Sequence, residues 1–297
     1  MSTTQTKAII ASLSVPSASP SFEAVQNLTR DLKKAAVTLS KQEARFLVDS
    51  YYQMQDSRIR TAGQMREMAE SGEPHEVLKW FNTQAEHLET EVQKALDAYS
   101  NGFVLGRWAR SQYGIGPVIA AGLLAHIDIA KAETAGAIWR FAGLDPTSKW
   151  EKGQKRPWNA QLKVLCWKIG QSFLKQCNRD GDVYGHLLME RKALETTKNE
   201  MSAYSTQAAE ILKRVPGHAQ KAIYAAGKLP PGHILSRAER YAVKLFLAHY
   251  HHVGYELLHA KLPPKPYVIE HGGHTHFLAP PNWPIQEKIP VGLPGLP

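Results

Sequence analysis

The chain has 297 residues, of which 43% are hydrophobic and 21% charged, a balance typical of folded globular proteins. This composition excludes a wholly disordered chain, and no run approaches the roughly 20 apolar residues of a membrane span, so we expect no membrane association. Lysine and arginine number 36 against 27 acidic residues, a formal net charge of +9 that favours polyanionic partners. Two cysteines, Cys166 and Cys177, are too few for a disulfide framework. We therefore expect both in the core of a cytoplasmic protein, nucleoid-associated if it binds DNA.

The N-terminal part predicts a flexible tail followed by a long helical hairpin. Residues 1–20 are rich in Ser, Thr, Ala and Pro and carry no strong apolar run. From residue 21 the apolar positions recur at three and four, which predicts a mainly α fold. Ser40 with Glu43 three residues later predicts a capped helix that runs to about Glu70. A second helix is expected from Pro74 toward residue 112, so 21–112 should form an antiparallel hairpin.

The sequence changes character at Gly114-Ile115-Gly116-Pro117, a tight turn between two helical patterns. Glycines allow close backbone approach, and proline presets the first turn of the next helix. The amides at a helix N-terminus can bind a phosphate. These four residues are therefore candidate contacts to nucleic acid, and a connection without a ligand is the alternative.

A strongly basic segment follows. From 147 to 180 there are eight lysines and arginines against two acidic residues, Glu151 and Asp180. Lys and Arg neutralise phosphates along a nucleic-acid backbone, and nearby Trp158 and Trp167 are either ring platforms or core. The alternative is an ordinary solvated helix face. The candidate nucleic-acid contacts in this segment are Lys149, Lys152, Lys155, Arg156, Asn159 and Lys163.

Three pieces of the segment 113–170 carry a family resemblance. They are Gly-Ile-Gly-Pro-Val-Ile-Ala-Ala-Gly-Leu-Leu-Ala, then Phe-Ala-Gly-Leu-Asp-Pro, then Gly-Gln-Lys-Arg-Pro-Trp-Asn-Ala-Gln-Leu-Lys. In this order and spacing they resemble the C-terminal transposase domain of the insertion-sequence family that includes Piv-type DNA invertases and bridge-RNA-guided recombinases. The resemblance implies a helix-hairpin-helix-like domain over 113–182 that handles nucleic acid.

The catalytic parts of that family are not matched here. Its members carry an N-terminal RuvC-like domain with four acidic residues, but no alternating strand pattern with Asp or Glu precedes residue 113. The family's serine nucleophile has only Ser148 as a nearby counterpart. We therefore expect a protein related to mobile-element transposases that binds DNA, or structured RNA, without an evident catalytic domain. The alternatives are an active recombinase or metal-dependent nuclease, and a helical homo-oligomeric interaction protein in which 74–112 and 183–214 pack on partner copies.

The remaining residues predict a helical extension over 183–262 and a His- and Pro-rich end over 263–297. Residues 183–214 form one polar pattern in which Leu187, Leu194, Met201 and Ala208 lie seven apart. This spacing suits either a coiled coil or a hairpin packed on the main body. A final helix is expected from Ser236 to about Ala260, and its apolar side should be core. That side carries Phe246, Tyr250, Val253 and Leu257.

Histidines are concentrated in these last two segments. On the final helix His249, His252, Glu256 and His259 are spaced by three, four and three residues, so they share one side. A Gly-Gly β-hairpin is expected over 267–278, and it would place His271, His274 and His276 on one face. The two elements together can supply a structural zinc site. The alternative is a polar seam of hydrogen-bonded histidines, and no cofactor is implied with certainty.

Overall fold

The structure, a computed structural model, describes residues 26–72, 76–264 and 277–285. Within these ranges it has eleven α-helices and no strand, which confirms the mainly α fold. None of the described helices combines the length and the apolar character that a membrane span requires. The expected tail over 1–20 lies outside the described residues, as does most of the expected β-hairpin, including its three histidines.

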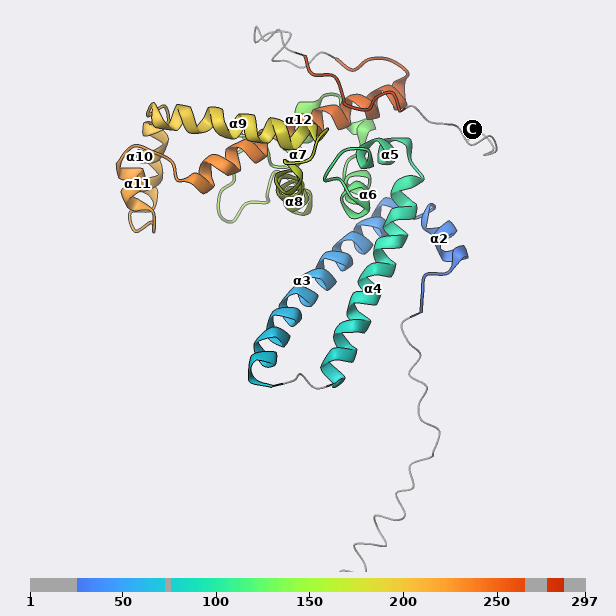
Figure 1. Ribbon diagram of the computed structural model, residues 1–297. Helices are drawn as coiled ribbons and strands as arrows, with labels where there is room; N and C mark the ends of the chain where they lie inside the picture. Colours follow the sequence, from blue (N-terminus) through green and yellow to red (C-terminus); the bar gives the residue numbers. More distant parts are fainter. Residues whose placement is uncertain (1–25, 73–75, 265–276, 286–297) are drawn as a thin grey trace, which may run out of the picture.

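Two long helices, α3 (Lys41–Ser71) and α4 (Glu76–Asn101), form the expected antiparallel hairpin, which projects from the other helices (Figure 1). The first helix starts where the sequence predicts, because Ser40 Oγ accepts from the Glu43 amide at 3.2 Å. In return the Glu43 carboxylate accepts from the Ser40 amide at 2.7 Å, which completes a capping box. A short helix, α2 (Arg30–Ala36), packs on α4.

The second long helix is shorter than expected. It ends at Asn101, and the chain then turns into a separate helix, α5 (Val104–Arg110). The two helices cross so closely that a Cβ at Gly106 would lie 2.0 Å from the Ser100 carbonyl oxygen. Only glycine allows this approach, so the predicted single helix toward residue 112 is replaced by a break and a tight crossing.

The helix α6 (Pro117–His126) is buried on all sides, with eight of its ten residues inaccessible. One side carries Val118 and Ala121 into a core cluster with the base of α3 and α4. The other carries Ala120 and Leu123 into the larger cluster of the molecule. A helix that is apolar all round belongs in an interior, and α6 connects the hairpin to the rest of the fold.

The larger cluster is built around α12 (Pro231–His259), which packs on α9, α8, α7 and α5. It starts five residues before the expected Ser236, with proline in its first turn. Phe246, Tyr250 and Val253 are fully buried as predicted, whereas Leu257 is 43% exposed, contrary to prediction. Between α6 and α12 the described elements are η1 (Ile129–Lys131), α7 (Ala135–Phe141), α8 (Ala160–Gln176), α9 (Val183–Glu200), α10 (Ser205–Arg214) and α11 (Lys221–Ala225).

The segment 183–214 is two helices rather than one. The first ends at Glu200, Met201 is 76% exposed, and Ser202 takes a positive φ of 60° that reverses the chain. Asn199 fixes this reversal, because its side chain bonds both the amide and the carbonyl of Leu229. The seven-residue spacing therefore crosses a turn and forms no coiled coil. The expected domains 113–182 and 183–262 contribute to the same core cluster.

The described end of the chain, which we call the C-terminal segment (277–285), lies across α5 and α12. Trp108 is fully buried and donates from Nε1 to the Pro281 carbonyl at 2.9 Å. Gln112 Nε2 donates to the same carbonyl at 3.2 Å. Trp283 Nε1 donates to the Glu256 carboxylate at 2.6 Å. The segment therefore supplies acceptors and donors to side chains of the main body.

Candidate nucleic-acid interface

The predicted basic residues lie in a loop whose two ends are tied together. We call residues 147–159 the basic loop. At its end Asn159 caps α8, since its side chain accepts from the Leu162 amide at 2.9 Å and its own amide donates to the Phe141 carbonyl at 2.9 Å. Gly143 has φ +67°, and a Cβ there would lie 2.8 Å from the Trp158 ring. The loop is thus closed at its base and presents its cations outward.

Two of these cations rest on tryptophan rings. The Arg156 guanidinium lies 5.2 Å from the Trp150 ring centre, and Lys163 Nζ lies 4.2 Å from the Trp158 ring centre. Such contacts hold a cation in place while leaving it free to meet an anion. Within the described residues none of the loop cations or Lys163 forms an ion pair, in contrast to Arg58, which binds Glu89 at 2.6 Å. The exposed cations are Lys149, Lys152, Lys155, Arg156 and Lys163.

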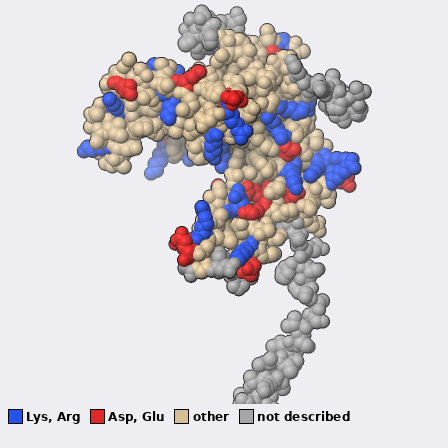
Figure 2. All heavy atoms as spheres, in the orientation of Figure 1, with Lys and Arg blue, Asp and Glu red and all other residues tan. Residues whose placement is uncertain are grey.

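The electrostatics extend this group to a neighbouring helix. Burial lowers the pKa of Lys163, and the positive charges of Arg156 and Arg240 lower it further. Because Arg240 belongs to α12, cations from the loop, α8 and α12 lie within electrostatic reach of one another. Figure 2 shows basic side chains along the edge of the α9–α12 layer that faces the hairpin. The surface is therefore rich in cations, and those of the loop and Lys163 have no ion-pair partner among the described residues.

The turn 114–117 connects α5 to α6 in the expected helix–turn–helix arrangement. Gly114 has φ +85°, and its carbonyl accepts from Ser172 Oγ at 2.6 Å. Pro117 occupies the first turn of α6 as predicted, and Gly116 precedes it as the N-cap. Ile115 is only 4% exposed, so its side chain belongs to the core and not to a ligand surface. The backbone contacts expected of 114–117 stay a prediction.

The turn and the basic loop do not form one cluster. Ser172, which binds the turn, follows Lys163 by nine residues on α8, a separation of about 14 Å along the helix. The turn therefore sits toward the C-terminal end of α8, and the loop sits at its N-terminal end. Of the predicted contacts, the structure brings together those of the loop and Lys163.

Three histidines of α12 are engaged in hydrogen bonds, namely His249, His251 and His252. His249 is buried, with Nδ1 2.8 Å from the Tyr184 hydroxyl and Nε2 2.9 Å from the Leu278 carbonyl. Burial lowers the pKa of His249 to about 4, so its ring is neutral. His252 Nε2 lies 2.9 Å from the Glu256 carboxylate. The ring of His259 packs on Tyr255, with centres 4.3 Å apart.

These contacts bear on the predicted zinc site. Within the described part of the chain no three His, Cys, Asp or Glu side chains come together to hold a metal ion. His271, His274 and His276 lie outside that part, so a site that combines both elements stays a prediction. Cys166 is buried as expected, whereas Cys177 is only partly buried.

A basic stripe on α12 was not among the predicted residues. His233, Arg237, Arg240 and Lys244 follow one another by four, three and four residues, which places them on one face of the helix. Lys244 Nζ lies 4.3 Å from the Trp139 ring centre, and Trp139 Nε1 donates to the Lys244 carbonyl at 2.9 Å. The spacing of these four basic residues by four, three and four is visible in the sequence and could have revealed the stripe.

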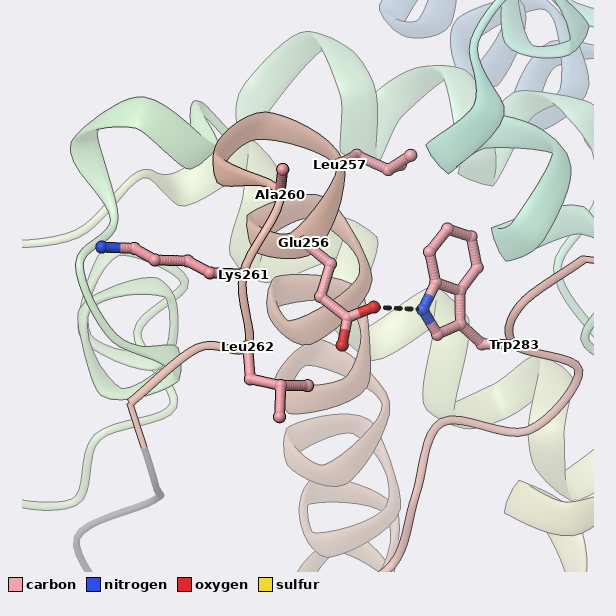
Figure 3. Close-up of a pocket in the computed structure, with 6 residues that line it drawn as sticks. All are labelled: Glu256, Leu257, Ala260, Lys261, Leu262 and Trp283. Carbon is pink, nitrogen blue, oxygen red and sulfur yellow. Dashed lines mark hydrogen bonds between the residues drawn. The ribbon is translucent and has the colours of Figure 1, made fainter.

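Two open hollows lie apart from the basic loop. In the first, of 360 Å³, the Glu256 carboxylate faces Leu262 and Trp283 and is already bonded to the Trp283 ring nitrogen (Figure 3). The second, of 460 Å³, lies between α10 and the start of α12 and includes Arg214 and His233. The exposed basic surface is therefore the stronger candidate site.

Comparison of the chain with protein-family models, curated proteins and solved structures finds no match.

Proposed function

We propose that this chain binds nucleic acid through the basic loop and the start of α8, with DNA as the first candidate ligand. One observation carries the proposal: five exposed cations lie on one loop and the adjoining helix turn, without an ion-pair partner among the described residues. Clustered positive charges repel one another. Binding to nucleic acid is favourable because these cations neutralise phosphates and release the counterions condensed on the nucleic acid. Some cations elsewhere, such as Arg110 with Asp97 at 2.6 Å, form ion pairs within the fold.

Aromatic rings support the same ligand class. Trp150 is 42% exposed and lies under Arg156, and Trp167 on α8 is 60% exposed. Exposed rings beside cations can stack on unpaired bases while the cations follow the backbone. The likeness of 113–170 to the transposase domain of the insertion-sequence family also favours a nucleic-acid ligand. Contacts of this type position a strand without reading its sequence.

The proposal is tested by binding of the purified protein to labelled duplex DNA, single-stranded DNA and structured RNA across a salt series. For duplex DNA we expect log K to fall with log salt by about 0.9 per neutralised phosphate, or about 4.5 for five contacts. The preferred nucleic acid is the one with the highest affinity at the same salt. Absence of binding to all three at low salt would overturn the proposal.

The helical hairpin favours a second candidate function, self-association. Beyond Tyr51 on α3 and before Glu89 on α4, no described side chain of the hairpin is buried. Yet Ile59 is 55% exposed on α3, and an apolar stripe runs along α4. That stripe consists of Leu78, Phe81 and Leu88, spaced by three and seven residues. Helices without a buried apolar face gain stability when they pack on a partner, so we propose a second copy of this hairpin as that partner.

Light scattering across a concentration series tests self-association. The wild-type mass should exceed that of one chain, and replacing Leu78 and Phe81 with glutamate should return it to one chain. The matched control replaces Thr83 and Thr90 on the same helix with glutamate, since both are already exposed. A wild-type mass equal to one chain at every concentration would refute this candidate.

A further inference from the structure

The stripe on α12 has the length and the position to continue the surface of the basic loop. We call His233, Arg237, Arg240 and Lys244 the α12 stripe. Its first and last members are 11 residues apart, about 16 Å along the helix at 1.5 Å per residue. Arg240 lies within electrostatic reach of Lys163 on α8, which rests on Trp158 at the end of the basic loop. Lys244 also contacts Trp139 on α7, and Gly143, just after α7, packs on Trp158 at the end of the basic loop. The loop and the stripe therefore both adjoin α7 as neighbouring cationic regions.

The members of the stripe differ in whether the fold neutralises them. Arg237 Nε binds the buried Glu195 carboxylate at 2.6 Å. Arg240 and Lys244 form no ion pair among the described residues. Lys244 is held over the Trp139 ring, which leaves its charge available. Exposed Arg240 and half-buried Lys244 thus carry charges with no ion-pair partner among the described residues.

Like charges around Arg240 repel one another. Burial lowers the pKa of Arg240, and the charge of Arg237 lowers it further, although Glu239 and Glu195 oppose this. Burial also lowers the pKa of His233, with added effects from Arg240 and Arg237. For Lys244, burial lowers the pKa and Asp145 opposes it. Burial is the largest cause of the lowered pKa of both Arg240 and Lys244, and a phosphate beside them would favour their charged forms.

We propose that the nucleic-acid backbone continues from the basic loop across α12, where Arg240 and Lys244 contact phosphates of one strand. This inference rests on the proposed function and adds a second contact region to it. At about 3.4 Å of helix axis per phosphate, the stripe spans about five phosphates of one strand of duplex DNA. Because Arg240 and Lys244 are long cations on a regular helix, they would contact the backbone and not the bases.

The test is the salt dependence of binding for a variant with Arg240→Gln and Lys244→Gln. On duplex DNA we expect the slope of log K against log salt to become shallower by about 1.8, which is 0.9 for each lost contact. At 0.1 M salt this corresponds to an affinity loss of about 10- to 100-fold. On single-stranded DNA or structured RNA the slope should also become shallower, and the ligand with the largest change is the one that the stripe fits.

A matched control separates local contacts from net charge. Replacing Lys33 and Lys34 with glutamine removes the same charge from exposed positions on α2, which packs on α4. That control should bind within about twofold of wild type. Arg240→Gln alone keeps the contact between Lys244 and Trp139 and should still make the slope shallower by about 0.9. An equal loss in the α2 control would overturn the inference.

The outcome also distinguishes this inference from the proposed function. If the α12 variants bind like wild type while neutralisation of the basic loop abolishes binding, the proposed function stands and the α12 contact is refuted. If wild type binds no nucleic acid, both fail. Thermal unfolding of each variant, compared with wild type, confirms that a loss of binding does not arise from loss of the fold.

Discussion

Neutralising the five cations of the basic loop and α8 is expected to reduce affinity for nucleic acid by about 10³- to 10⁴-fold at 0.1 M salt. The variant replaces all five residues with glutamine and keeps side-chain length similar. Each lost phosphate contact makes the salt dependence on duplex DNA shallower by about 0.9, so the slope should change by about 4.5. The five residues are Lys149, Lys152, Lys155, Arg156 and Lys163.

The loop itself should survive this change. Its closure depends on Gly143, Trp158 and Asn159, which the variant leaves intact. The control replaces five exposed cations on other elements, which lowers the net charge equally. These are Lys33, Lys34, Arg60, Arg66 and Lys221. Equal affinity losses in the loop variant and in this control would show that only total charge matters, and the basic loop would not be the site.

Removal of the Glu195 side chain is expected to give the largest loss of stability among single substitutions at charged residues, about 3–5 kcal/mol for Glu195→Ala. The carboxylate is 1% exposed and binds Arg191 at 2.5 Å and Arg237 at 2.6 Å. It also accepts a short hydrogen bond from the Tyr204 hydroxyl. Without it two arginines would face each other across a buried space, so the free energy of unfolding should fall. Urea unfolding at neutral pH measures the loss.

The Glu195 carboxylate should also make the free energy of unfolding depend on pH. Burial alone would raise the pKa of Glu195, but the hydrogen bonds from Tyr204 and Arg237 and the charges of both arginines lower it from 4.5 to about 2. Because the folded pKa lies below the unfolded one, the stabilisation is complete above pH 4.5 and is lost as the pH falls toward 2. Glu195→Gln should lack this contribution, so wild type and variant should converge in stability at low pH. Parallel curves would contradict the assignment.

The sequence correctly located helix starts that depend only on residues adjacent in the chain. The start of α3 follows from Ser40 and Glu43, and the start of α6 follows from Pro117, because capping and proline geometry act within one turn. The hairpin alternative for 183–214 allowed a break, but its position after Glu200 was not predicted, because the reversal uses Ser202 with positive φ, where the sequence offers no glycine. The seven-residue spacing from Leu187 to Ala208 runs across the turn and therefore gives no sign of it.

The candidate site was predictable only in part. The cations of the basic loop stand out by composition alone, and their exposure agrees with the expectation. The burial of Ile115 depends on where Gly114 and its neighbours meet α8, which local spacing does not reveal. The α12 stripe has a readable spacing, but its relation to Lys163 arises from helix packing. Tertiary contacts therefore decide which charged residues share a surface.

The C-terminal segment determines where this chain can be shortened. A fragment that stops before Phe277 would leave the Trp108 ring nitrogen without the Pro281 carbonyl, and His249 without the Leu278 carbonyl. Each buried polar group left without a partner costs about 1–3 kcal/mol. The boundary of a stable fragment thus lies after Ile285, more than 20 residues beyond α12, the last helix among the described residues, which ends at His259. Truncation at that helix would remove an integral part of the core's hydrogen bonding.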